Sequence, residues 1–136
     1  MNVDMDVSFT PQKLRAFSRN EVRMEINLKN LTESSVYWGE CEIVVASPLS
    51  LAHDIEMNTG KTRIGILKPM GYASKIVKLY TRPNNYPDDY KFKITAYIYD
   101  EDGAIAERFD KNLSIECMQE ELAKEPPVKD KDNKIN

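Results

Sequence analysis

Hydrophobic and polar side chains alternate one by one along much of this chain, which is the period expected of β-strands with one buried face. The pattern is cleanest from Val22 to Leu28, where four apolar residues are separated by charged or amide side chains. The same alternation runs through residues 3–9 and 90–98. These three segments are predicted to be strands that face a hydrophobic core.

Shorter apolar runs predict the remaining strands, at residues 36–46, 63–67, 72–81 and 104–117. In the segment 36–46 we expect Trp38, Cys41, Ile43 and Val45 to point inward, with a bulge near Gly39 that brings the two halves into phase. Residues 48–62 break the alternation. They are predicted to form an irregular crossover or a short helical turn.

Turn residues and two aromatic residues indicate how the strands are arranged. Asp102-Gly103 favours a hairpin, because this pair readily takes the positive φ angles of a tight turn. Trp38 in the third expected strand and Tyr90 at the start of the penultimate one stand where immunoglobulin-type domains place a core tryptophan and a corner tyrosine. The chain shows neither a long amphipathic helix nor an internal repeat. We therefore expect an all-β fold, an immunoglobulin-like two-sheet antiparallel β-sandwich of about seven strands.

Composition indicates one domain. The chain has 136 residues, of which 41% are hydrophobic, and this is enough to bury one core. The sandwich is predicted to cover residues 1–118. Residues 119–136 combine two prolines and mixed charge with few apolar side chains, the composition of a largely disordered tail.

Charge and hydropathy argue against two classes of partner. The formal net charge is −3, with 19 Lys and Arg against 22 Asp and Glu, so no basic field collects phosphates. No apolar run approaches the roughly 18 residues of a membrane helix, and residues 1–7 carry two aspartates instead of the apolar core of a signal peptide. We expect a soluble cytoplasmic protein with no nucleic acid partner and no membrane insertion, or an extracellular protein if a signal has been removed.

Several motifs resemble known sandwich families. Asp88-Asp89-Tyr90 resembles the Asp-x-Tyr corner of immunoglobulin-like domains. Residues 22–30, the segment from Gly65 to Pro69 and residues 90–103 are similar to the adhesion-type, CARDB-like sandwiches of archaea and bacteria. In that family a strand ending in asparagine precedes a proline-containing turn, a long strand and a tyrosine-led hairpin. The resemblance implies a domain that binds and does not catalyse.

Candidate catalytic chemistry depends on a single histidine, His53. A catalytic arrangement would need Asp54 or Asp89 as the orienting carboxylate and Cys41 as the nucleophile. A lone histidine in a polar loop is usually a solvated side chain, and one histidine with two distant cysteines lacks the clustered ligands of structural zinc. We expect no enzyme activity, no cofactor and no metal, with a small enzyme that uses His53 as an alternative.

Acidic residues gather in two turns that would offer calcium ligands if the turns met. These are Asp88-Asp89 and Asp100-Glu101-Asp102. Oxygen ligands from adjacent loops suit calcium, but no Asp-x-Asp-x-Asp-Gly loop is present. Acidic residues are also common in turns for their geometry alone, and this is the interpretation we expect.

Two cysteines and two glycosylation sequons have structural interpretations. Cys41 and Cys117 stand in alternating apolar contexts, where buried free thiols are common. The sequons begin at Asn30 and Asn112. We expect them to reflect turn chemistry and chance, not glycosylation.

A pair of tyrosines marks the candidate interaction face. Tyr97 and Tyr99 lie on the opposite side of their strand from residues 92, 94 and 96, so both are expected to be partly exposed, on the same side as Lys91 and Lys93. Exposed tyrosines provide a large contact area at low entropic cost, although lysine stems would also cover the rings. We expect a non-catalytic protein–protein interaction or assembly module that binds another protein, or itself as a homodimer, through a sheet face or an edge strand. The alternative is a surface-associated adhesion or carbohydrate-binding domain whose export signal is missing.

Overall fold

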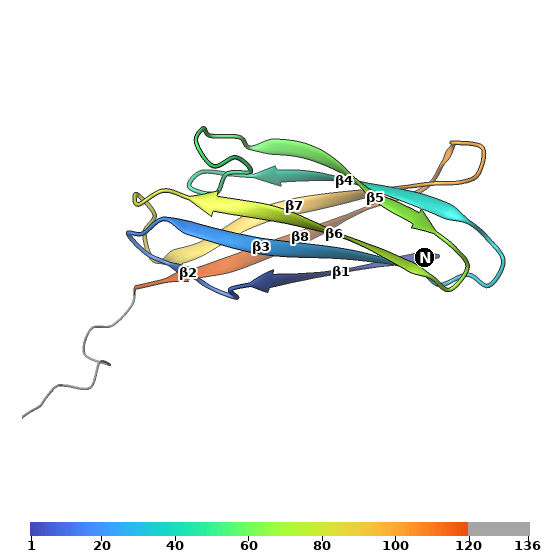
Figure 1. Ribbon diagram of the computed structural model, residues 1–136, viewed down its shortest axis with the longest axis horizontal. Coiled ribbons are helices and arrows are strands. Elements are labelled where there is room, and N and C mark those ends of the chain that lie inside the picture. Colours follow the sequence, from blue (N-terminus) through green and yellow to red (C-terminus); the bar gives the residue numbers. More distant parts are fainter. Residues whose placement is uncertain (120–136) are drawn as a thin grey trace, which may run out of the picture.

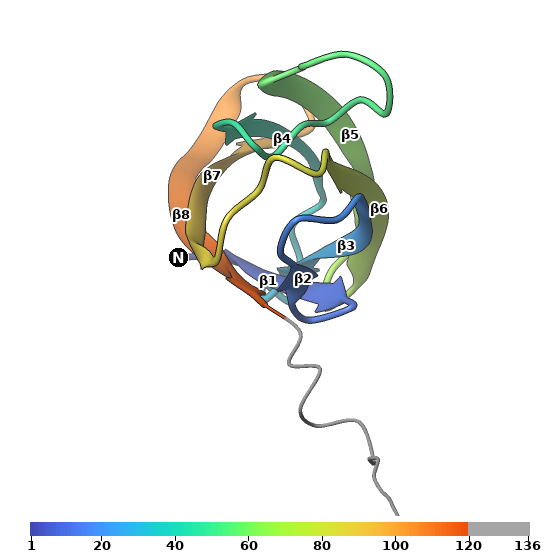
Figure 2. The ribbon, with the colours of Figure 1, turned by 90° about the vertical axis from the view of Figure 1, so that its left-hand side faces the viewer.

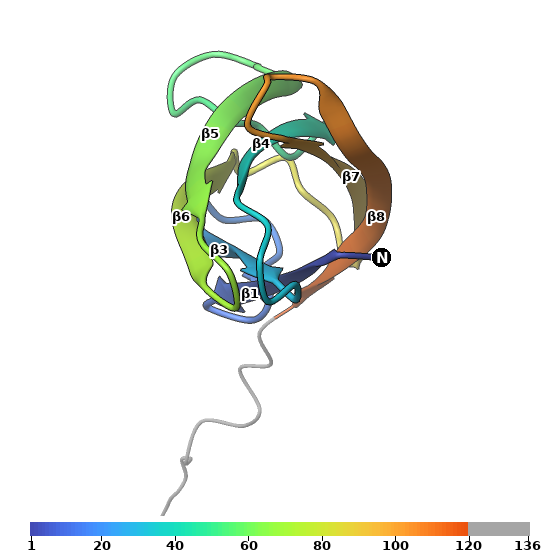
Figure 3. The ribbon, with the colours of Figure 1, turned by 90° about the vertical axis from the view of Figure 1, so that its right-hand side faces the viewer.

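The computed structural model describes residues 1–119, whose regular elements are all β-strands (Figure 1). The strands are β1 (Val3–Thr10), β2 (Leu14–Arg15), β3 (Asn20–Asn30), β4 (Tyr37–Val45), β5 (Thr59–Leu67), β6 (Tyr72–Thr81), β7 (Asp88–Tyr99) and β8 (Ile105–Met118). They form two sheets, with the strand orders β1-β3-β6 and β2-β8-β7-β4-β5. Viewed along the strands, the two sheets curve around a common interior (Figures 2 and 3). The predicted immunoglobulin-like, two-sheet β-sandwich is confirmed.

The seven longer strands are those that the alternation predicts, whereas β2 was not predicted. It contains two residues and pairs in parallel with the end of β8, where Leu14 lies opposite Cys117. All other strand pairs are antiparallel. β5 begins at Thr59, before the predicted start at residue 63. The prediction missed residues 59–62 because none of them has an apolar side chain that would mark a strand. The predicted crossover is wrong, because β4 and β5 are antiparallel neighbours in one sheet and residues 46–58 form the loop of their hairpin, which contains no helical turn.

Two further expectations concern the ends of the domain and the membrane. The predicted tail at residues 119–136 lies, apart from Gln119, outside the described residues. Within residues 1–119, no helix has the length and apolar character needed to cross a membrane.

Alternating side chains from both sheets meet in one hydrophobic core. The predicted inward residues of β3, namely Val22, Met24, Ile26 and Leu28, are all completely buried. The largest fully buried side chains also include Leu14, Ile43, Leu49, Leu67, Leu79, Ile94, Ile98 and Ile115. Burial of each such side chain contributes about 1.5–3 kcal/mol. The core therefore determines which face of each strand is left to solvent.

The prediction is wrong about the direction of Trp38. Tyr37 and Gly39 on either side of it are buried, and the alternation continues without a break to Val45. Trp38 therefore points out of the sandwich and is half-exposed. The sequence is compatible with both phases because two large aromatic residues, Tyr37 and Trp38, stand next to each other on opposite faces.

A bulge does lie near Gly39, but the extra residue belongs to β5. The pairing of β4 with β5 steps from Gly39–Gly65 to Glu40–Arg63. Gly65 has a φ of +150°, which residues with a side chain rarely adopt, and a Cβ atom there would lie 3.1 Å from Ala73 Cβ of β6. The glycine thus permits a close approach of β5 to β6 where the two sheets meet.

Tyr90, near the start of β7, forms the expected tyrosine corner. Its hydroxyl donates a hydrogen bond to the backbone carbonyl of Tyr86, a few residues upstream. Desolvation by burial raises the pKa of Tyr90. The hydroxyl therefore keeps its proton and its role as a donor at neutral pH.

Removal of this hydroxyl in Tyr90→Phe is expected to lower the free energy of unfolding by about 1 kcal/mol, because the ring stays packed and only the hydrogen bond is lost. Urea denaturation followed by circular dichroism measures the change. Tyr72→Phe is the matched control, since Tyr72 is 67% exposed, and it should change stability by less than about 0.5 kcal/mol. Equal losses in the two variants would refute a stabilising role for the corner.

Candidate protein-interaction face

The outward side chains of β5, β4, β7 and β8 lie in rows that cross the sheet. The register partners Ile66, Trp38, Tyr99 and Ile105 form one such row, here named the apolar row. Its two ends are open to solvent, with Ile66 66% exposed and Ile105 57% exposed, and its two aromatic residues are half-buried. The row lies at the end of the sheet where β5 finishes and β8 starts (Figure 1). Contiguous exposed apolar side chains mark a candidate interaction surface.

Two rows of charged and polar side chains adjoin the apolar row, and we name them the charged rows. The nearer contains Arg63, Glu40, Tyr97 and Arg108, and the next contains Lys61, Glu42, Thr95 and Asp110. Three cationic side chains and three carboxylates balance within these rows. This part of the face therefore carries no net charge.

Arg63, Trp38 and Tyr99 form a continuous stack across three strands. The guanidinium carbon of Arg63 lies 5.5 Å from the centre of the Trp38 ring, on the β5 side. The Tyr99 ring lies on the β7 side, with 4.1 Å between the ring centres and 15° between the ring planes. Contacts of these two kinds contribute about 0.5–1.5 kcal/mol each. The Tyr99 ring thus covers the β7 side of the indole, while the β5 side adjoins a hollow that Arg63, Gly65 and Ile66 line together with Trp38.

Hydrogen bonds hold both tyrosines of the face in place. The Tyr99 hydroxyl donates to Glu40 Oε1 at 3.2 Å, and the Tyr97 hydroxyl donates to Glu42 Oε1 at 3.4 Å. Desolvation, followed by the hydrogen bond to Glu40, raises the pKa of Tyr99, which keeps this hydroxyl neutral at pH 7. The guanidinium carbon of Arg108 lies 5.6 Å from the centre of the Tyr97 ring. Side chains fixed in this way lose less conformational entropy when a partner binds them.

The structure places Tyr97, Tyr99, Lys91 and Lys93 on the outward side of β7, as the alternation indicates. The two tyrosines lie in the apolar and charged rows, whereas the two lysines lie toward the other end of the strand and border a shallow groove beside Val44. The tyrosine rings contact glutamates and an arginine, not the lysine stems that the sequence offers as a cover. The predicted face is therefore two regions of different chemistry on one strand.

The neighbours that complete the tyrosine region come from other strands. Trp38, Ile66 and Ile105 are missed by sequence reasoning because the period along a strand carries no information about which residue lies opposite on the next strand. The available signal is the unbroken alternation from Tyr37 to Val45, which places Trp38 outward without any bulge in β4.

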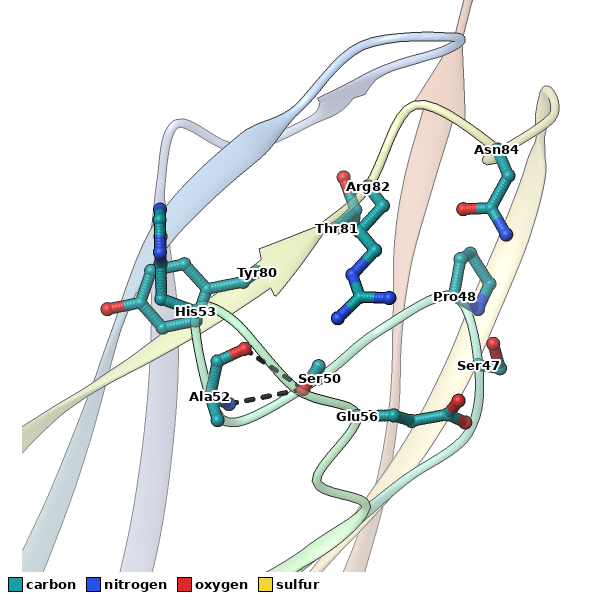
Figure 4. Close-up of a pocket in the computed structure, with 10 residues that line it drawn as sticks. All are labelled: Ser47, Pro48, Ser50, Ala52, His53, Glu56, Tyr80, Thr81, Arg82 and Asn84. Carbon is teal, nitrogen blue, oxygen red and sulfur yellow. Dashed lines mark hydrogen bonds between the residues drawn. The ribbon is translucent and has the colours of Figure 1, made fainter.

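A small pocket lies at the opposite end of the sandwich, beside the loop that joins β4 to β5 (Figure 4). The Oγ atom of Ser50 organises this loop, since it accepts the backbone N–H groups of Ala52 at 3.1 Å and Met57 at 2.9 Å and donates to the Ile55 carbonyl at 2.9 Å. The pocket holds about 50 Å³. This is room for a few water molecules, far below the roughly 300–1,000 Å³ of ordinary ligand sites.

His53 lines this pocket beside one of its two expected carboxylates. Its Nδ1 lies 2.7 Å from Asp54 Oδ1, but 64% and 88% of the two side chains are exposed. Cys41 is completely buried on β4, and burial raises its pKa to about 12, so the thiol stays protonated at neutral pH. Neither Cys41 nor Asp89 lines the pocket. Within residues 1–119, His53 therefore does not lie beside Cys41, the nucleophile that the sequence offers.

The two acidic turns lie at opposite ends of β7, so the calcium alternative, which requires them to meet, is wrong. The strand separates Asp88 from Asp100 by its full length, about 40 Å at ~3.3 Å per residue. Asp100 Oδ1 accepts the backbone N–H groups of Asp102 at 2.9 Å and Ala104 at 3.0 Å, which closes the hairpin. Among residues 1–119, no group of three or more His, Cys, Asp or Glu side chains is placed to hold a metal ion.

Asn30, the first sequon asparagine, has a structural role. It is completely buried, and its Nδ2 donates to the backbone carbonyls of Ser35 at 2.8 Å and of Leu67 and Lys68 at 3.1 Å. The nitrogen that would carry a glycan is thus fully engaged. Asn112 of the second sequon lies exposed on β8.

Cys41 and Cys117 are free thiols and both are buried. Cys117 lies beside Asn85, whose Nδ2 is 3.5 Å from the Cys117 Sγ and donates to the Arg15 carbonyl at 3.0 Å. Burial raises the pKa of Cys117 as well. The buried Asn85, which sequence reasoning misses, connects the loops before β3 and before β7.

Comparison with solved structures supports the fold and no more. A non-cellulosomal cohesin from the hyperthermophilic archaeon Archaeoglobus fulgidus superposes with a TM-score of 0.50 at 15% identity, over 90% of this chain and 96% of the cohesin. A family 123 glycoside hydrolase from Clostridium perfringens gives 0.46 at 10% identity, over 88% of this chain and 28% of the hydrolase. The major subunit of aggregative adherence fimbriae type I from Escherichia coli gives 0.42 at 6% identity, over 88% and 97%.

The cohesin similarity supports the two-sheet sandwich, while identities this low say nothing about activity. No protein-family model matches the chain, and no curated protein matches it in sequence. The resemblance to CARDB-like sandwiches therefore stays a prediction.

Proposed function

We propose that this protein is a non-catalytic protein-binding module that acts through the outward face of β5, β4, β7 and β8. The observation that carries the proposal is the apolar row, in which two strongly exposed isoleucines flank a pinned pair of aromatic rings. Aromatic residues and arginine are enriched at protein interfaces, where they supply most of the binding energy. The charged rows beside them provide the polar rim that such interfaces have.

The stacking of the aromatic rings and the exposed isoleucines favour a protein partner over a sugar. A flat sugar ring stacks on an open aromatic face, whereas Tyr99 occupies one face of the Trp38 ring and the Arg63 guanidinium carbon lies 5.5 Å from the ring centre. Exposed isoleucine side chains and a hollow lined by Trp38, Arg63, Gly65 and Ile66 remain for a partner. This surface suits the aliphatic and aromatic side chains of another protein.

An edge strand is the other route to binding, and among the strands described β8 has the longest open edge. β7 pairs with one side of β8, and β2 covers only its last two residues on the other side. Lys111 points inward from this edge and its Nζ donates to the Met5 carbonyl of β1 at 2.9 Å, while Glu107 Oε2 accepts the Asn2 backbone N–H at 2.6 Å. Inward-pointing charges on an edge strand prevent its pairing with other strands. This arrangement favours the face over the edge.

The matched variants Ile66→Glu and Ile76→Glu test the proposal. Ile66 lies in the apolar row, whereas Ile76 is 45% exposed on β6 in the other sheet. The two variants and the wild type are immobilised and incubated with an extract of the cells that make this protein. We expect at least one protein that the wild type and Ile76→Glu capture and that Ile66→Glu loses by about tenfold or more, because a charge introduced into an apolar contact is not compensated.

Trp38 provides the direct readout, since it is the only tryptophan of the chain. When the captured protein is purified and titrated against the wild type, the tryptophan emission of this chain should shift to shorter wavelength as the ring edge loses water. Identical capture by all three forms, or binding that leaves the Trp38 emission unchanged, would contradict the proposed face.

A further inference from the structure

The apolar row has nearly the same order from either side, because an isoleucine, two aromatic residues and an isoleucine follow one another across the four strands. A two-fold axis parallel to the strands, between β4 and β7, would place Ile66 over Ile105 of a second copy and Trp38 over Tyr99 of that copy. We propose that this face binds a second copy of the same chain in this arrangement. The inference rests on the proposed function and specifies its partner.

Charge is compatible with this self-association. The charged rows hold equal numbers of cations and carboxylates, so two copies of the face do not repel each other as a whole. The same axis places Lys61 over the second copy's Asp110, which pairs opposite charges twice in a symmetric dimer. Arg63 would face the second copy's Arg108, but Glu40 lies beside Arg63 in register and balances this contact.

The other sheet offers no comparable surface. The outward positions of β1 and β3 are mainly charged, namely Asp4, Asp6, Arg23, Glu25 and Lys29. On β6 the outward Ile76 has Glu25 as its register partner on β3, and Ser74 and Lys78 separate it from the outward Tyr72 and Tyr80 along the strand. Among the outward faces described, only that of the five-stranded sheet combines apolar contact with balanced charge.

The size of the face predicts a weak dimer. Four strands spaced by about 4.8 Å and three rows spaced by about 6.7 Å cover roughly 20 Å by 20 Å. This is smaller than the roughly 800 Å² that each partner buries in a standard interface. We therefore expect a dimer that dissociates on dilution, with a dissociation constant on the order of 10 μM.

Sedimentation equilibrium over about a hundredfold concentration range around that value tests the association of the full chain. The wild type should follow a monomer–dimer equilibrium. Ile66→Lys and Ile105→Glu should each raise the dissociation constant by about tenfold or more, and the control Ile76→Lys should leave it unchanged. Far-UV circular dichroism verifies that each variant keeps the sandwich, which is expected because all three positions are exposed.

Mixing experiments test the symmetry itself. In a mixture of Ile66→Lys and Ile105→Glu chains, one contact of the heterodimer pairs lysine with glutamate and the other keeps two isoleucines, so dimers should reappear near the wild-type strength. A mixture of Ile66→Lys and Ile66→Glu chains pairs each new charge with an isoleucine, and it should remain monomeric.

Three results would overturn the inference. These are a wild type that is monomeric at every concentration, a dimer that is insensitive to Ile66→Lys, and equal recovery in both mixtures. The proposed function survives each of these results if Ile66→Glu still abolishes capture of a different protein while Ile76→Glu does not. Loss of the dimer and identical capture by all forms together would refute both.

Discussion

Asn30→Asp is expected to destabilise the domain by about 4 kcal/mol at pH 7, which is enough to unfold a marginally stable sandwich. The Asn30 Nδ2 donates to three backbone carbonyls, and its Oδ1 accepts both the backbone N–H of Thr32 at 3.0 Å and its hydroxyl at 2.7 Å. A carboxylate would place a second negative oxygen against those three carbonyls at a site with no access to water. Each buried acceptor left without a donor costs about 1–3 kcal/mol, and a buried charge costs more.

Urea denaturation compares this variant with Asn112→Asp, the same exchange at the exposed asparagine of the other sequon. The control should change stability by less than about 0.5 kcal/mol. Burial raises the pKa of the introduced carboxyl in the folded state, so protonation favours folding of the variant. The difference in the free energy of unfolding between Asn30→Asp and the wild type should therefore shrink as the pH falls toward about 4, where a carboxyl in the unfolded chain also gains its proton. Equal effects at the two asparagines would show that the buried network does not stabilise this end of the sandwich.

Gly39→Val is expected to lower the free energy of unfolding by about 3 kcal/mol through overpacking. A Cβ atom at Gly39 would lie only 2.4 Å from Leu28 Cδ1, and Ile98 and Leu67 close the site from two other strands at 3.6 and 3.8 Å. Leu28 is completely buried, so it has no solvent-filled space into which it can turn. Differential scanning calorimetry should record the loss as a lower midpoint of thermal unfolding.

A double-mutant cycle identifies the cause. Leu28→Ala alone removes core contacts and should cost about 2–5 kcal/mol. In the double variant, the cavity left by Leu28→Ala accommodates the valine side chain, so the combined loss should fall short of the sum by at least about 1 kcal/mol. Strict additivity would mean that the steric conflict lies with another neighbour of Gly39.

The period-two alternation was sufficient to predict the long strands and the core face of most of them. It failed at Trp38 because large aromatic side chains stand on both faces of β4 at that point, and hydrophobicity alone does not choose between them. In the structure, position 39 faces Leu28 in the core, where glycine is the only amino acid small enough to fit. Because Gly39 points inward, its neighbour Trp38 points outward.

The candidate face depends on contacts that no single segment contains. Ile66 and Ile105 belong to different hairpins and meet the two aromatic rings only through the pairing of β5 with β4 and of β7 with β8. The buried role of Asn30 likewise depends on carbonyl groups of Leu67 at the end of β5 and of Lys68 just after it, which approach only in the folded chain. The separation of the two acidic turns, by contrast, was predictable, because an extended strand lies between them.

The described chain begins and finishes at opposite ends of the long axis of the sandwich (Figure 1). A stretching force applied between Val3 and Met118 would run parallel to the strands. It would pull β1 lengthwise against β3, so all eight residue pairs of that ladder would be loaded together. Hydrogen bonds strained simultaneously fail at a higher force than bonds opened one after another from a hairpin end. The sandwich should therefore resist a stretching force through the simultaneous loading of the β1–β3 hydrogen bonds.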